Sequence, residues 1–221
     1  MAYFDVFLIS SLALFLLVFA GRTAYLLISK HINPITLRIG KNRVLGIIEI
    51  SLFVAVNLWA VEVIFYSLNL DLRLFPWPLS LQLIHLVPLQ VLGAILIVLG
   101  FVVCILALAS IGDSWRLGID DRRPGKLVTT GIYALCRNPI YVFFDLYFIG
   151  TFLVNGALIF LLFALFVTAN LHYQILEEER FLTRVHGPTY LAYRTRTGRY
   201  MTWRRQPQRA ASTSSDQLPV A

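Results

Sequence analysis

Two clusters of polar residues suited to ligand binding flank one apolar stretch of this chain. The first occupies residues 131–141 and contains Arg137 and two tyrosines, and the second begins with Glu177-Glu178-Glu179. About 35 mostly apolar residues separate the clusters, with Asn155-Gly156 as a single turn signal near the middle. If this stretch crosses a bilayer and returns, both clusters emerge on the same side and can close on one ligand. Packing alone is a poor explanation for such spacing.

The helices that must position these clusters are visible as apolar runs. With 58% hydrophobic residues and a mean hydropathy of +0.73, the chain is more apolar than a soluble domain of 221 residues. A helix rises roughly 1.5 Å per residue and the hydrocarbon core is roughly 30 Å thick, so a run of about 20 residues can span it. The sequence predicts an all-α membrane protein with five transmembrane helices, at residues 4–28, 44–68, 89–111, 140–154 and 157–176.

The predicted helices belong to one domain. Residues 1–203 are predicted to form a single polytopic membrane domain, and residues 204–221, rich in Gln, Ser and Ala, a disordered tail. Residues 181–200 are amphipathic and are interrupted at Gly187-Pro188. They predict an amphipathic C-terminal helix that lies along the cytoplasmic membrane surface.

Basic residues are concentrated on one side of the predicted membrane. The loops after the first and third spans and the segment after the fifth hold 17 of the 19 lysines and arginines. Five alternating spans place these three regions on one face, and the positive-inside rule then puts the N-terminus outside and the C-terminus in the cytoplasm. The sequence thus predicts a multi-pass integral membrane protein whose polar site faces the cytoplasm. The net charge of +7 is mostly a topology signal, so nucleic-acid binding is not needed to explain it.

Several residues have both a structural and a functional interpretation. Asn138-Pro139 predicts a helix start, with asparagine capping free N–H groups and proline in the first turn. Asp145 lies four residues after Tyr141, so both project from one helical face, and an intramembrane acid is functional by default. It would hold an amine, orient a tyrosine or pair with a polar neighbour. His172 is either structural or a base for a thiol or amine. Asp145 and His172 are the candidate catalytic residues, and no metal-type spacing is present.

The two clusters resemble the motifs of the membrane-embedded methyltransferase family of isoprenylcysteine carboxyl methyltransferase and phosphatidylethanolamine N-methyltransferase. The family pattern Arg-His-Pro-x-Tyr-x-Gly corresponds to residues 137–143, and its Glu-Glu-x-x-Leu to residues 178–182. The resemblance covers roughly residues 125–200. Because two separated motifs occur in the right order, it is more specific than either motif alone. It implies S-adenosylmethionine-dependent methyl transfer to a lipophilic or small apolar acceptor at the membrane.

The resemblance also implies where S-adenosylmethionine binds, within about residues 112–200. A carboxylate such as Glu178 accepts hydrogen bonds from ribose or pairs with the ammonium group of the cofactor. Tyrosines offer adenine a flat apolar face with a polar edge. The cofactor-binding residues that the resemblance implies are Lys126, Leu127, Val128, Tyr133, Arg137, Asn138, Pro139, Ile140, Tyr141, Glu178 and Glu179.

Three positions depart from the family pattern. Asn138 replaces the histidine but keeps a hydrogen-bonding side chain, whereas Phe143 replaces the glycine and removes a place where backbone can approach a ligand. Gln174 occupies the position of an arginine that is implicated in substrate binding in the prenylcysteine enzymes. As the candidate substrate residue, this neutral glutamine cannot pair with a carboxylate as arginine does, which argues against a prenylcysteine carboxylate. A phospholipid amine, a small thiol and a prenylated or other lipid-like carboxylate stay open as acceptors, with the carboxylate disfavoured by Gln174.

Two other functions are compatible with the sequence. The first is an NADPH-dependent membrane reductase of the sterol-reductase type, in which Arg122, Arg123 and Lys126 would pair with the 2′-phosphate. The glutamate pair argues against it, because acids near a dinucleotide phosphate repel it. The second is a non-enzymatic membrane scaffold. No glycine-rich strand–turn–helix fingerprint of soluble dinucleotide-binding domains is present, so a cofactor must bind among helices.

Overall fold

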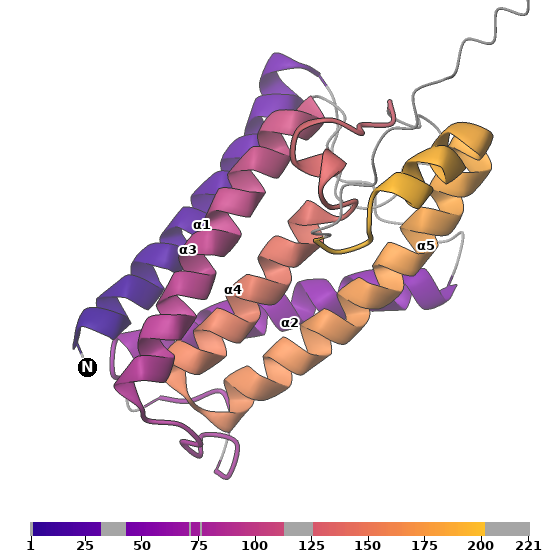
Figure 1. Ribbon diagram of the computed structural model, residues 1–221. Helices are drawn as coiled ribbons and strands as arrows, with labels where there is room; N and C mark the ends of the chain where they lie inside the picture. Colours follow the sequence, from indigo (N-terminus) through magenta and orange to yellow (C-terminus); the bar gives the residue numbers. More distant parts are fainter. Residues whose placement is uncertain (1, 32–42, 71, 76, 113–125, 202–221) are drawn as a thin grey trace, which may run out of the picture.

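The computed structural model describes residues 2–31, 43–70, 72–75, 77–112 and 126–201, and over these residues the fold is all-α (Figure 1). All five predicted helices are present, and their bounds agree with the prediction to within two residues except at the end of the last. Arg122, Arg123 and the tail 204–221 lie outside the described residues. The elements are α1 (Ala2–Ser29), α2 (Arg43–Ser67), α3 (Val87–Ile111), the 3-10 helix η2 (Gly131–Ala134), α4 (Pro139–Asn155) and α5 (Leu158–Arg196).

Four of the helices, α1, α2, α3 and α5, are long and apolar enough to cross a membrane. Their outward faces carry large apolar side chains such as Leu17 and Phe53, each 70% exposed. Helix α4 has 17 residues, which corresponds to about 26 Å, slightly less than the roughly 30 Å of a hydrocarbon core. It lies between α3 and α5 in Figure 1. The four long apolar helices indicate a multi-pass integral membrane protein.

Glycines allow α3 and α4 to pack backbone against backbone. A Cβ on Gly93 would lie 2.6 Å from the carbonyl oxygen of Gly150, and a Cβ on Gly150 would lie 2.7 Å from the carbonyl oxygen of Gly93. Neither distance leaves room for a side chain. Small residues are the usual means of such close approach between helices in membranes. The contact fixes the position of α4, and therefore of the polar cluster at its start, relative to α3.

An aromatic core joins α4 to α1 and α2. The Phe15 and Tyr147 rings are stacked with centroids 5.4 Å apart, and Trp59 meets Tyr147 edge-on at the same separation. The hydroxyls of Ser11 and Tyr147 are hydrogen-bonded at 3.2 Å. Phe143, at the position of the motif glycine, is completely buried and stacks on Phe15. The departure from the glycine is thus accommodated by core packing between α1 and α4.

The predicted turn at Asn155-Gly156 joins α4 to α5 and is held by the connection between α2 and α3. Gly156 has a φ of 83°, a left-handed conformation that favours glycine. A Cβ there would lie 1.9 Å from the carbonyl oxygen of Ile84. The N–H of Leu83 donates to the Gly156 carbonyl at 2.8 Å, and the N–H of Leu158 donates to the Leu81 carbonyl at 2.9 Å. Because the two helices run back along each other, the start of α4 and the second half of α5 lie at the same end of the bundle.

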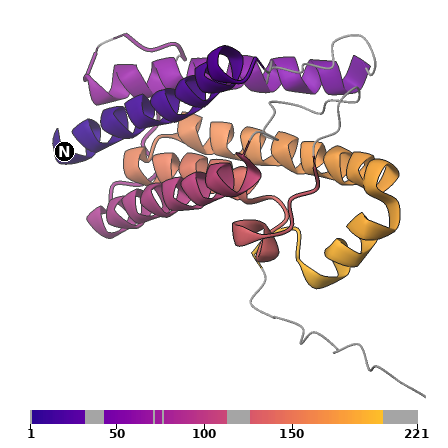
Figure 2. The ribbon, with the colours of Figure 1, turned by 90° about the horizontal axis from the view of Figure 1, so that it is seen from above.

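Helix α5 corrects one prediction. It was expected to end at Leu176, but its helical backbone continues to the kink at Gly187. The straight part, residues 158–186, is about 44 Å long, which exceeds the roughly 30 Å of a hydrocarbon core. It continues because residues 177–186 contain neither glycine nor proline. The predicted break at Gly187-Pro188 is confirmed: Gly187 has non-helical φ and ψ of 49° and −125°. Beyond the kink the chain folds back toward η2 (Figure 2), so the C-terminal amphipathic helix is a kinked continuation of α5.

Gly93→Ala is expected to lower the midpoint of thermal unfolding in detergent by several degrees. The added methyl group meets the Gly150 backbone, and overpacking of this kind costs about 1–3 kcal/mol. Tryptophan fluorescence during heating measures the midpoint. Gly21→Ala is the matched control, because no atom lies within 4 Å of a Cβ at Gly21. Equal midpoints for the two variants would contradict backbone contact between α3 and α4.

Candidate functional site

The structure brings the two predicted polar clusters together. The hydroxyl of Tyr141, in the first turn of α4, donates to Oε2 of Glu178 on α5 at 2.8 Å. Both side chains are half-buried. The pair spans 37 positions of the sequence, so it depends on the return of the chain through the Asn155-Gly156 turn. A phenol and a carboxylate thus meet at one end of the bundle, just beyond its most apolar part.

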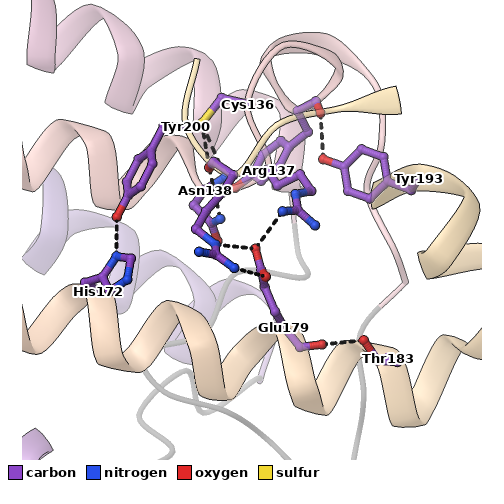
Figure 3. Close-up of polar contacts among 10 residues, drawn as sticks. Cys136, Arg137, Asn138, His172, Glu179, Thr183, Tyr193 and Tyr200 are labelled. Carbon is purple, nitrogen blue, oxygen red and sulfur yellow. Dashed lines mark hydrogen bonds and ion pairs between the residues drawn. The ribbon is translucent and has the colours of Figure 1, made fainter. Parts of the chain in front are cut away.

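Glu179, the next residue of α5, is bound by two arginines (Figure 3). Its Oε1 accepts from Nη2 of Arg137 at 3.0 Å, and Arg199 contributes a bidentate pair with distances of 3.1 and 2.9 Å. The side chains of Arg137 and Glu179 are each only 7% exposed. Two guanidinium groups thus surround one carboxylate, which leaves an excess of positive charge. The hydrogen bond to Glu179 also raises the pKa of Arg199, so this guanidinium stays charged.

Arg137 keeps unused hydrogen-bond donors. Its Nε and Nη1 atoms are buried and have no hydrogen-bond partner among the described residues, and the same holds for Nε2 of His186. A buried donor that lacks a partner costs about 1–3 kcal/mol, more where it is charged. The donors of Arg137 are therefore suited to an anionic group of a ligand.

Residues 197–200, here called the C-terminal strap, close this end of the molecule. Arg137 N–H donates to the Gly198 carbonyl at 3.0 Å, and the Asn138 side-chain amide donates to the Arg199 carbonyl at 3.1 Å. The hydroxyl of Tyr193, just before the strap, donates to the Tyr133 carbonyl at 2.6 Å. These three contacts join the strap region to residues 133–138, ahead of α4.

These contacts correct the interpretation of Asn138. Its side chain makes no capping hydrogen bond to α4, because its amide is directed to the Arg199 carbonyl instead. The companion prediction for Pro139 is confirmed, since proline is the first residue of α4. The N-terminus of α4 is thus positioned by the strap and by Pro139, without a side-chain cap.

The two candidate catalytic residues lie further into the apolar bundle than the Tyr141–Glu178 pair. Asp145 is about one turn after Tyr141 on α4, and His172 is about two turns before Glu178 on α5. Thr168 Oγ1 donates to Oδ1 of Asp145 at 2.9 Å, so of the three roles open to Asp145 the observed contact is with a polar neighbour. His172 Nδ1 lies 2.7 Å from the hydroxyl of Tyr200 in the strap. Gln174, the candidate substrate residue, is half-buried on the same helix.

The remaining predicted cofactor residues lie around η2 and ahead of it. Lys126 is exposed, whereas Leu127 and Val128 are half-buried. Val128 and Ile140 pack against the buried cluster that contains Tyr133. Burial also raises the pKa of Tyr133, so its phenol stays neutral. Because Ile140 precedes Tyr141, this cluster lies next to the start of α4, where Tyr141 meets Glu178.

Four residues of the site escaped the sequence analysis: Thr168, Tyr193, Arg199 and Tyr200. Each contacts a residue that is distant in the sequence. The partner of Arg199 is 20 positions away, and that of Tyr193 is 60 positions away. The available signal was the excess of arginines after residue 176, which the sequence analysis interpreted mostly as a topology signal. In the described residues, no group of three or more His, Cys, Asp or Glu side chains is arranged to hold a metal ion.

Residues 89–189 match the family model for phospholipid methyltransferases. The matched segment contains most of α3, all of η2 and α4 and most of α5. With the residues that connect these elements, it includes all of these site residues except Tyr193 and the strap. This part of the chain, just under half of its length, is similar to the phospholipid methyltransferases. The match confirms the resemblance that the two motifs indicated.

A curated relative is consistent with this match. Over 131 residues the chain is 28% identical to the protein-S-isoprenylcysteine O-methyltransferase of Saccharomyces cerevisiae. The match covers 58% of this chain and 53% of that protein, so the chain spans about half the length of the curated relative that it matches. No solved structure matches the chain.

Cys136 reports whether the strap is closed. Its thiol donates to the Arg199 carbonyl at 3.5 Å, is 1% exposed, and has a pKa that burial raises to about 11. In a Cys104→Ala background, we expect slow alkylation by iodoacetamide, with a rate that rises about tenfold per pH unit below 11 as the thiolate forms.

Glu179→Gln is expected to speed this alkylation by at least about tenfold at pH 7.5, since losing a buried charge partner costs about 3–5 kcal/mol and frees the strap. Mass spectrometry measures the modified fraction over time. Glu177→Gln is the control, because Glu177 pairs only with the exposed Arg180 in the contacts described. If both variants react at the wild-type rate, the strap does not depend on Glu179.

Proposed function

We propose that this protein transfers a methyl group from S-adenosylmethionine to a lipophilic or small apolar acceptor at the membrane. The observation that carries the proposal is the meeting of Tyr141 and Glu178 next to Glu179, which pairs with the buried Arg137. The match of residues 89–189 to the phospholipid methyltransferase family model supports it. When bound, the cofactor supplies an electrophilic methyl group on a sulfonium.

The residues present fit the polar groups of this cofactor. Glu178 offers a carboxylate to ribose hydroxyls or to the ammonium group, and Tyr141 fixes its orientation through the 2.8 Å hydrogen bond. The unused Nε and Nη1 donors of Arg137 suit the cofactor's carboxylate. The chain would thereby contribute alignment of the reactants and exclusion of water, the main requirements of an in-line displacement.

The contacts of the two glutamates distinguish their roles. Glu179 is engaged by Arg137 and Arg199, whereas Glu178 accepts one hydrogen bond from a neutral phenol. Glu178 is therefore the carboxylate with capacity left for a ligand. Glu179 acts on the cofactor through Arg137, which it holds in place.

We further propose that the site faces the cytoplasm and that the N-terminus lies outside. The support is the concentration of 17 of the 19 basic residues in the three regions that alternating spans place on one face. C-terminal fusions in a bacterial host test this orientation. A green fluorescent protein fusion is expected to fluoresce and an alkaline phosphatase fusion to be inactive. The reverse pattern would refute the orientation.

Calorimetric titration of the detergent-purified protein tests the cofactor. S-adenosylmethionine is expected to bind, and Glu178→Ala to weaken binding about 10- to 100-fold, because a hydrogen bond to a charged group is worth about 1.5–3 kcal/mol. Glu177→Ala is the matched control, since it removes the neighbouring carboxylate, which pairs with an exposed arginine. It is expected to leave the affinity within about twofold.

The same titration with NADPH separates the alternative functions. Binding of NADPH without binding of S-adenosylmethionine would replace the methyltransferase by a reductase. If folded protein, monodisperse on size exclusion, binds neither compound, the scaffold is favoured.

A further inference from the structure

The strap adds a side chain to the part of the site that contains the candidate base. Tyr200 Oη lies 2.7 Å from Nδ1 of His172, and the two rings are stacked with centroids 6.2 Å apart and an interplanar angle of 16° (Figure 3). A hydrogen bond and a stacking contact together fix both the position and the rotation of the imidazole. His172 comes from α5, whereas Tyr200 is 28 positions further along the chain.

An acid on α4 completes this arrangement. Asp145 interacts electrostatically with both His172 and Tyr200, and Thr168, one helical turn before His172, orients its carboxyl at 2.9 Å. Asp145 is therefore the acidic group of α4 that acts on both members of the Tyr200–His172 pair.

The phenol of Tyr200 is suited to passing a proton on. Burial raises its pKa, and the negative charge of Asp145 raises it further, while Arg199 opposes the shift. Cys136 and Glu179 are the other titratable groups that act on it. Tyr200 therefore keeps its proton at neutral pH and releases it only when another proton replaces it. It is also 37% exposed, so a ligand can reach it.

We propose that Tyr200 and His172 form a proton relay that deprotonates the methyl acceptor. The inference rests on the proposed methyl transfer and deepens it, because it makes the acceptor a proton-bearing nucleophile, an amine or a thiol. A carboxylate acceptor is already ionised at neutral pH and has no use for a relay. Glu178 lies six positions after His172, roughly 9 Å along the helix, so the relay and the cofactor carboxylate contact different parts of the reacting pair.

The proton and electron balance is simple. The acceptor's N–H or S–H proton passes to Tyr200 Oη as the phenolic proton passes to Nδ1 of His172, which gives a neutral phenol and an imidazolium. The lone pair of the nitrogen or sulfur then forms the bond to the methyl carbon, and the carbon–sulfonium electron pair returns to sulfur. The imidazolium afterwards releases its proton to water.

Tyr200→Phe tests the relay, because it keeps the ring on His172 and removes the hydroxyl. The full chain in nanodiscs receives radiolabelled S-adenosylmethionine with three acceptor probes in turn: phosphatidylethanolamine, 1-octanethiol and N-acetyl-S-farnesylcysteine. We expect methylation of the amine or the thiol probe, which also separates these two sources. At saturating cofactor, Tyr200→Phe is expected to lower the rate at least about tenfold, within the range of general base catalysis.

The pH profile separates a relay from a merely structural role. In the wild type, the rate is expected to level off at a pH below that at which the acceptor itself ionises, because the relay removes the acceptor's proton. In Tyr200→Phe, the rate is expected to follow ionisation of the acceptor itself, at higher pH. The affinity for S-adenosylmethionine is expected to stay unchanged. Tyr173→Phe, the same substitution at the residue after His172, is the matched control and is expected to keep the wild-type rate and profile.

The remaining outcomes each decide between the two proposals. Methylation of farnesylcysteine alone would overturn the relay and leave the proposed function standing. Full activity of Tyr200→Phe, or a variant whose only defect is weaker cofactor binding, would also overturn the relay. Binding of S-adenosylmethionine without methylation of any probe counts against it. If the wild type fails to bind S-adenosylmethionine, the proposed function fails, and the relay fails with it.

Discussion

The buried carboxylate of Glu179 is the interaction on which the polar end of this molecule depends. It binds Arg137, ahead of α4, and Arg199, beyond the kink in α5. A buried charge is tolerated only when it is paired, and loss of one partner leaves the other uncompensated. The three segments are therefore ordered together. Since Arg137 also donates its backbone N–H to the strap, the same interaction sets the position of the residues that precede Tyr141.

This polar arrangement needs a rigid apolar frame. The contact between Gly93 and Gly150 fixes α4 against α3, and the hydrogen-bonded turn at Gly156 sets the start of α5. A shift of α5 by one residue along its axis, roughly 1.5 Å, would break the Tyr141–Glu178 hydrogen bond. The geometry of the site thus depends on contacts toward the opposite end of α4, a helix of 17 residues.

The helices and the meeting of the two clusters could be predicted because both depend on local sequence. Apolar runs mark the spans, and Asn155-Gly156 marks the return. Contacts made by the strap could not be predicted, because an arginine in a basic segment carries no sign of its partner 20 positions earlier. The helix cap expected at Asn138 failed for the same reason, since a distant carbonyl at Arg199 took the amide. The length of α5 was underestimated because the run of apolar residues ends at Leu176, whereas the helical backbone continues until Gly187.

The adjacent glutamates show how one motif serves two purposes. Successive residues of a helix project about 100° apart, so Glu178 and Glu179 face different neighbours: a tyrosine of α4 in one case and two arginines in the other. Removing the charge of Glu179 would act mainly on the strap, and removing that of Glu178 mainly on a ligand. Among the described residues, Arg137 pairs with Glu179 through Nη2, and its Nε and Nη1 have no hydrogen-bond partner. A cationic group with donors to spare is thus bound to the residue next to Glu178. A site that offers both charges within a few residues favours a zwitterionic ligand over a purely anionic one, which is a physical reason to prefer S-adenosylmethionine over a dinucleotide phosphate.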